Sequence, residues 1–174
     1  TSRCGFIYEG WPGGGVPHPL RSAVRPLVLR EAPEAGAKET ARLPARAGEP
    51  LRMTASRLMS TRSGWARARF ALALEARSFG KTETLSRAAV DGPAPKSSLS
   101  LAAGELLEVL APRAESDCFI RRGGEVFEAA CPHLDGERFE VVEEPAASWW
   151  LEIETSYGRG WVDAEDPALT LLRD

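Results

Sequence analysis

The chain has 174 residues with a hydrophobic fraction of 43% and a charged fraction of 27%, close to the values of ordinary globular proteins. Neither a disordered chain nor a collagen-like fibre is therefore expected. The formal net charge is −3. The longest apolar runs, such as 70–74, are far shorter than the ~18 residues that a membrane-spanning helix needs, so we expect no transmembrane segment.

The charge is distributed unevenly along the chain. Residues 1–90 contain 15 Lys and Arg against 7 Asp and Glu, whereas residues 91–174 contain 7 against 18. A split of this kind predicts one basic and one acidic module, which attract each other or bind different partners. The basic half has no run of five or more cations, so nucleic-acid binding is only an alternative.

Two breaks in composition suggest the domain boundaries. Residues 1–24 include a stretch rich in Gly and Pro, at 11–19, and are expected to be irregular because these residues disfavour helices. Residues 91–98 have the composition of a linker and lie where the charge balance changes sign. We therefore expect a basic module over 25–90 and an acidic module over 99–174, the second with an added N-terminal hairpin.

Short segments of alternating polarity predict β-strands. Phe139 and Val141 alternate with charged residues, and Leu151 and Ile153 share one face of a second segment. Such strands recur about every ten residues without an amphipathic stretch of helix length, which favours an all-β protein made of small antiparallel barrels. Helix propensity alone also permits a helix over 66–76.

An internal repeat gives the clearest signal in the sequence. Four segments of the first half recur in the same order in the second half. The matched pairs are 27–33 with 118–124, 48–53 with 136–141, 64–69 with 148–153, and 78–81 with 156–159.

This pattern resembles the bacterial SH3-like (SH3b) domain family, in tandem copies at about 25–88 and 115–168. The second copy carries the family's Gly-led strand, Trp-led strand and closing Gly160-Trp161-Val162 in order. The resemblance implies two five-stranded, partly open barrels. It also implies a protein that binds extended peptides, peptidoglycan or partner proteins and catalyses no reaction.

The resemblance implies that Trp65 and Trp150 are the groove tryptophans of the two copies, with Tyr157 and Trp161 as further ligand-binding candidates. Strand alternation places Trp150 opposite the core-facing Leu151, which would leave its indole free, whereas Trp149 shares the buried side. The alternative for each tryptophan is a packing role at the edge of a barrel.

Glu143 and Glu144 belong to an acidic group in the second module. They are candidates for a negative groove that steers a cationic peptide. The alternative is a solvated face that keeps a small β-domain soluble.

Cys118 and Cys131 would close a loop of about 14 residues if they formed a disulfide. If Gly123 and Gly124 form a hairpin turn, Cys118 lies opposite Ala129 and is a diagonal neighbour of Cys131. Two buried free thiols are the competing interpretation. These cysteines match no common zinc module, and no catalytic constellation or nucleotide-binding loop is evident, so we expect no metal, cofactor or enzymatic activity.

From these features we expect a non-catalytic binding or targeting protein of the bacterial cell envelope, exported and periplasmic or envelope-associated, whose ligand is peptidoglycan or an extended peptide. A lipid anchor upstream of residue 1 is compatible with this location. Two alternatives are open. One is an adaptor or inhibitor whose oppositely charged modules hold a protein partner, and the other is a binder of nucleic acid or another anionic polymer through the basic first module.

Overall fold

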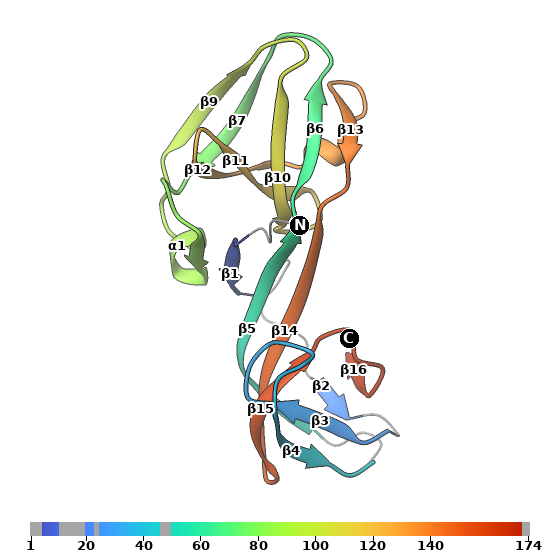
Figure 1. Cartoon of the computed structure of the whole chain (residues 1–174). Helices are drawn as coiled ribbons and strands as arrows, with labels where there is room; N and C mark the ends of the chain where they lie inside the picture. The colour runs from blue at the N-terminus through green and yellow to red at the C-terminus, as the bar shows by residue number, and fades with distance from the viewer. Residues whose placement is uncertain (1–4, 11–19, 23–24, 46–49, 172–174) are drawn as a thin grey trace. The chain divides into compact units, whose positions relative to one another are not determined.

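The computed structural model describes residues 5–10, 20–22, 25–45 and 50–171. The regular structure of these residues is almost entirely β, which confirms the all-β fold class (Figure 1). The chain divides into two compact units. Unit 1 consists of residues 1–14 and 58–148, and unit 2 consists of residues 15–57 and 149–174.

Unit 1 is built around a seven-stranded antiparallel sheet. Its elements are β1 (Ile7–Glu9), β6 (Gly64–Ala68), β7 (Leu72–Ser78), β8 (Thr84–Ser86), α1 (Arg87–Asp91), β9 (Lys96–Leu101), β10 (Leu106–Pro112), β11 (Asp117–Arg122), β12 (Glu125–Ala130), the 3-10 helix η1 (Pro132–Leu134) and β13 (Phe139–Glu143). The strand order in the sheet is β13-β6-β10-β11-β12-β7-β9. The β10, β11 and β12 strands are consecutive neighbours, as a meander requires.

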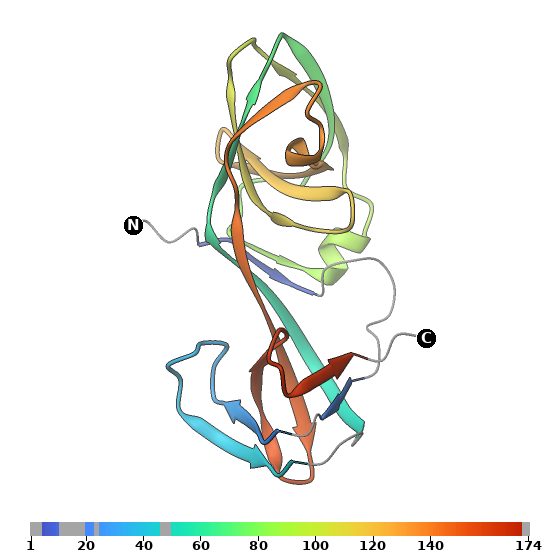
Figure 2. The same ribbon diagram turned by 90° about the vertical axis from the view of Figure 1, so that its right-hand side faces the viewer.

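Unit 2 takes strands from both ends of the chain (Figure 2). Its elements are β2 (Leu20–Ser22), β3 (Leu27–Arg30), β4 (Glu39–Leu43), β15 (Gly158–Asp163) and β16 (Leu169–Leu171). Two long strands, β5 (Pro50–Arg62) and β14 (Ala146–Thr155), have residues in both units. The strand order is β16-β2-β5-β14-β15-β3-β4.

Alternating residues build the core of each unit. In unit 1, the inward side chains of β10 and β11 are Leu107, Val109, Cys118 and Ile120, all of them buried. In unit 2, the core contains Leu27 and Leu29 from β3 and Leu151 and Ile153 from β14, among others. Core residues therefore recur at every second position along these strands, as the alternating sequence pattern predicted.

The β11 strand is buried on both faces. Its second face carries Phe119, whose ring lies 5.1 Å from the rings of both Phe6 and Tyr8. Phe6 and Tyr8 come from the N-terminal segment, where β1 pairs with β5 and with β8. Residues 1–24 are thus not uniformly irregular, because 7–9 and 20–22 form strands. The Gly- and Pro-rich stretch 11–19 lies outside the described residues.

The expected module boundaries are wrong. Residues 91–98 do not separate two modules, because β9 begins at Lys96 and pairs with β7 along its whole length. Both expected modules, 25–90 and 99–174, contribute strands to both units. The long-range pairing of β5 with β14 decides this arrangement, and no local composition signal records such a pairing.

Two local expectations are also resolved. Residues 66–68 belong to β6 and residues 72–76 to β7 rather than to a helix, because pairing with β10 and β9 outweighs the helix propensity of their alanines. Gly123 and Gly124 form the turn between β11 and β12 with φ values of +58° and +81°. Cys118 is paired with Ala129, as the turn predicted.

Candidate functional site

The six residues expected to bind ligand are divided between the two units. Trp150, Tyr157 and Trp161 belong to unit 2, and Trp65, Glu143 and Glu144 belong to unit 1. The opening strand of one expected SH3-like copy and the closing strands of the other copy lie in the same unit. The β3 strand of the first copy and the β14–β15 hairpin of the second copy lie together in unit 2, where Trp161 pairs with Arg30.

Trp150 and Trp161 do not present free indole surfaces. Trp150 is 7% exposed and Trp161 is 9% exposed. The predicted alternation is observed, since Trp149 packs against the core with Leu151 and donates a 2.6 Å hydrogen bond from Nε1 to Ser56 Oγ. The expectation that Trp150 is accessible is wrong, because its side chain is buried even though it lies opposite the core-facing Leu151.

A polar cluster surrounds Trp161 on that opposite face. The guanidinium of Arg57 lies 5.0 Å from the centre of the Trp161 ring, a cation–π arrangement. Glu152, which is paired with Trp161 across the strands, accepts hydrogen bonds from Arg159 Nη2 (2.6 Å) and Thr54 Oγ1 (2.8 Å). Burial raises the pKa of Glu152, but these two hydrogen bonds, together with the charges of Arg159 and Arg57, outweigh burial and leave the pKa below its ordinary value.

This cluster was missed by sequence reasoning because its members come from β5, β14 and β15. Thr54 and Glu152 are 98 positions apart. The only signal in the sequence was the alternation of charged residues along 151–154, which gives the face of Glu152 but not its partners.

Tyr157 is the expected ligand-binding residue of unit 2 that remains accessible. It lies in the turn between β14 and β15 and is 42% exposed. Its backbone N–H donates to Thr155 Oγ1 (3.1 Å), and the same hydroxyl donates to the carbonyl of Gly158 (3.1 Å). The turn that presents the phenol ring is therefore fixed by two side-chain hydrogen bonds.

The acidic candidates of unit 1 lie at the end of β13. Glu143 lies 3.6 Å from Arg62 Nε, and Glu144 lies 3.7 Å from His133 Nε2. Trp65 on β6 is half-buried and stands across from Glu143 on one side and from Glu108 of β10 on the other. The structure thus brings Trp65 and Glu143 together and places the Trp150 indole in different surroundings.

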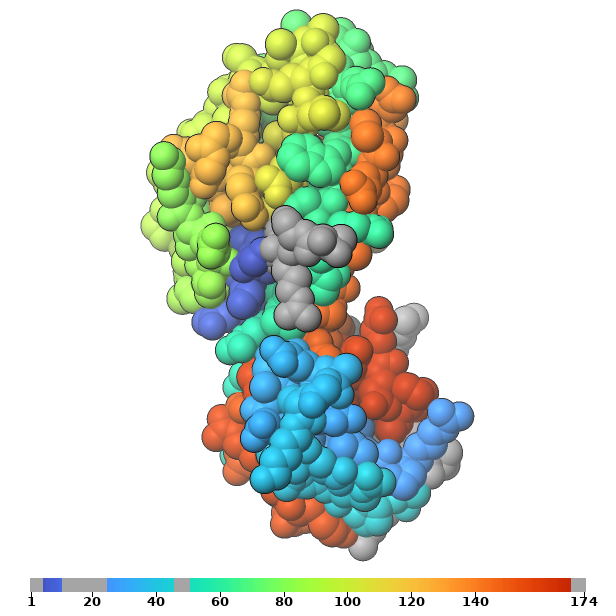
Figure 3. Space-filling model, in the orientation of Figure 1, coloured from blue at the N-terminus to red at the C-terminus, as the bar shows by residue number. Residues whose placement is uncertain are grey.

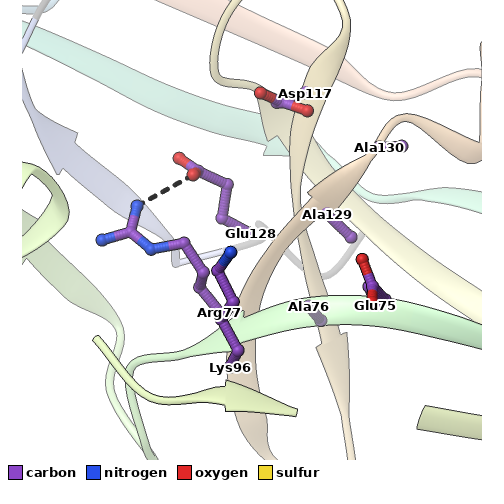
Figure 4. Close-up of a pocket in the computed structure, with 8 residues that line it drawn as sticks. All are labelled: Glu75, Ala76, Arg77, Lys96, Asp117, Glu128, Ala129 and Ala130. Carbon is purple, nitrogen blue, oxygen red and sulfur yellow. Dashed lines mark hydrogen bonds and ion pairs between the residues drawn. The ribbon is translucent and has the colours of Figure 1, made fainter. Parts of the chain in front are cut away.

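A hollow of about 210 Å³ lies on unit 1 at one end of β7, β9, β11 and β12 (Figure 4). Its lining residues are Glu75, Ala76, Arg77, Lys96, Asp117, Glu128, Ala129 and Ala130. Arg77 Nη1 lies 3.0 Å from Glu128 Oε1, and Arg113 Nε lies 3.3 Å from the other oxygen of the same carboxylate. Because these ion pairs already neutralise the central carboxylate, we assign the hollow no ligand.

Cys118 and Cys131 are joined by a disulfide, which decides between the two interpretations of these cysteines. Among the described residues, no group of three or more His, Cys, Asp and Glu side chains is arranged to hold a metal ion. No helix within the same residues is long and apolar enough to cross a membrane.

Comparisons of the chain with protein-family models, with curated proteins and with solved structures found no match.

Proposed function

We propose that the protein is a non-catalytic binding protein of a bacterial cell envelope, and that it recognises peptidoglycan or an extended peptide through one SH3-like module. In this proposal the module is interrupted: residues 25–57 supply its opening strands, and residues 149–171 supply its closing strands. The tandem arrangement of two complete copies is not retained, because each expected copy has strands in both units.

One observation carries the proposal. Pro33, the last residue of the opening motif of the first copy, and Gly160, the first residue of the closing motif of the second copy, lie 127 positions apart in the chain. Nevertheless, β15 pairs directly with β3 in unit 2. With residues 58–148 treated as an insertion, the segments of unit 2 follow one another in the order of the SH3b pattern, which supports the proposal.

The disulfide supports the location outside the cytoplasm. Disulfides persist in oxidising compartments such as the periplasm and are rare in the cytosol. The bond between Cys118 and Cys131 is therefore consistent with an exported protein.

The distribution of charge between the two units does not favour the two alternative functions. Unit 1 contains 12 Lys and Arg against 15 Asp and Glu, and unit 2 contains 10 of each. The basic and acidic halves of the sequence are thus mixed in the folded chain, and neither unit is a basic module. An adaptor with oppositely charged modules and a nucleic-acid binder with a basic module are therefore not favoured.

Retention on purified peptidoglycan tests the proposal. We expect the full chain to sediment with peptidoglycan, and we expect Tyr157→Ala to weaken retention by about tenfold, since an aromatic contact contributes about 1 kcal/mol or more. Tyr157 replaces Trp150 as the residue to test, because a change at the buried Trp150 would disturb packing instead.

The matched control is Phe70→Ala, which removes another exposed aromatic side chain, 50% exposed and located in unit 1. We expect it to leave retention unchanged. Absence of sedimentation of the unmodified chain would contradict binding to peptidoglycan, and an equal loss in both variants would contradict a site at Tyr157.

A further inference from the structure

The β13 strand lies at one end of the sheet of unit 1. Among the described strands it pairs with β6 alone. In Figure 3 the orange atoms of this part of the chain form the margin of unit 1 beside the green atoms of the β6 region. An edge strand presents backbone N–H and C=O groups that an extended chain can pair with.

A row of core-facing side chains crosses the sheet and ends at β13, where its last side chain is exposed. Val141 lies across from Ala66, and Ala66 lies across from Leu107. Ala66 and Leu107 are buried, whereas Val141 is 39% exposed because no described strand follows it. An added strand would place one of its side chains next to Val141, and burial there favours an apolar side chain.

Two further apolar side chains are exposed, one on β13 and one in the helix η1 that contacts it. Val142, the next residue of β13, is 50% exposed, and Leu134 in η1 is 69% exposed. Exposed large apolar side chains on an edge strand favour its coverage by a partner.

The opposite face of β13 is acidic. Glu140 lies across from Arg67, and Glu143 lies across from Trp65. Both carboxylates are exposed, and a guanidinium, that of Arg62, already approaches Glu143 to 3.6 Å. Because Arg62 already pairs with Glu143, Glu140 is the carboxylate that a side chain of an added strand would meet on this face, which favours Lys or Arg at that position.

We infer that β13 is a docking edge for an extended peptide in which Lys or Arg alternates with apolar residues, and that this peptide adds to the sheet as a further strand. The alternation follows from Glu140 and Val141, which are successive residues on opposite faces of β13, so neighbouring side chains of the peptide meet a carboxylate on one face and Val141 on the other. A bulge between Val141 and Glu143 places Glu143 on the same face as Glu140. His133 Nε2 lies 2.9 Å from the carbonyl oxygen of Glu143, so pairing is centred on residues 140–142. The site lies in unit 1 and is independent of the SH3-like module proposed above.

Binding of a fluorescent peptide of eight residues with alternating Lys and Val, measured by anisotropy with the full oxidised chain, tests this inference. A peptide of the same composition with its four Lys and four Val in separate blocks is the control for charge alone. We expect the alternating peptide to bind at least about tenfold more tightly, because only it satisfies both faces at once. Equal binding of the two peptides, or no binding of the alternating one, would overturn the inference.

Matched charge reversals locate the site. We expect Glu140→Lys to weaken binding about tenfold or more, because it places like charges opposite each other. Glu115→Lys makes the same change of charge at an exposed residue between β10 and β11 and should have little effect. An equal loss in both variants would show non-specific attraction and would overturn the inference.

Hydrogen exchange of the unmodified chain gives a measurement that does not depend on any variant. The bound alternating peptide should slow amide exchange in 140–142 and leave β9, the opposite edge of the same sheet, unchanged. Protection at β9 instead of β13 would contradict the assignment of the edge.

Discussion

Gly160 precedes Trp161 at a place where no side chain fits. A Cβ atom on Gly160 would lie 2.6 Å from Thr40 Oγ1, 2.8 Å from the carbonyl oxygen of Arg30 and 2.8 Å from Leu29 Cβ. These atoms belong to β3 and β4, so the missing side chain allows β15 to approach both strands. The glycine of the closing Gly-Trp-Val motif thus has a packing reason within unit 2.

Gly160→Ala should therefore destabilise the protein. We expect a loss of about 1–3 kcal/mol in the free energy of unfolding, the usual cost of forcing extra atoms into a packed region. Urea denaturation followed by Trp fluorescence measures it. Gly36→Ala is the matched control, since a Cβ there meets no atom within 4 Å, and it should change stability by less than about 0.5 kcal/mol. Similar losses in both variants would contradict the packing argument.

At the level of elements, the β11–β12 hairpin is the best-specified part of unit 1. Two glycines fix its turn, and the disulfide joins Cys118 at the start of β11 to Cys131 just after β12. The hairpin could be predicted from sequence because its turn, its alternation and its pairing are all local. By contrast, the sequences of β10 and β7 contain no such local signal that these strands pair with the hairpin.

Removal of the disulfide should lower the stability of the chain. For a loop of about 14 residues the entropic contribution is about 3 kcal/mol, and a double variant Cys118→Ala with Cys131→Ala should lose roughly that amount in urea denaturation. Reduction of the unmodified chain should give the same loss, whereas the double variant should not respond to the reductant. A stability of the unmodified chain that is insensitive to reduction would show that the bond contributes nothing.

At the level of the whole molecule, unit 2 is interrupted by residues 58–148. The β5 and β14 strands, which flank the interruption, are neighbours in unit 2, where Thr54 Oγ1 donates to Glu152 and Trp149 donates to Ser56. Residues 57 and 149 therefore lie on adjacent strands, close enough for a short turn to connect them.

A chain in which an Asn-Gly turn replaces residues 58–148 should fold. We expect dispersed amide resonances and cooperative unfolding, because the core of unit 2 takes its residues from 25–57 and 149–171. The segment 25–90 alone should remain unfolded, since it separates β3 and β4 from β14 and β15. The reverse result, a folded 25–90 and an unfolded joined chain, would restore the tandem arrangement.

The sequence by itself determined the all-β class, which side chains share a face of each strand, the β11–β12 turn and the pairing of Cys118 with Ala129. Each of these features depends on residues near one another in the chain. Tertiary structure alone decided which strands share a unit, how the two charged halves are mixed, and that Trp150 and Trp161 are covered. The physical reason is that a strand pattern gives the period and the face of each side chain, whereas its neighbours are chosen by hydrogen bonding and burial between distant segments, such as β5 with β14.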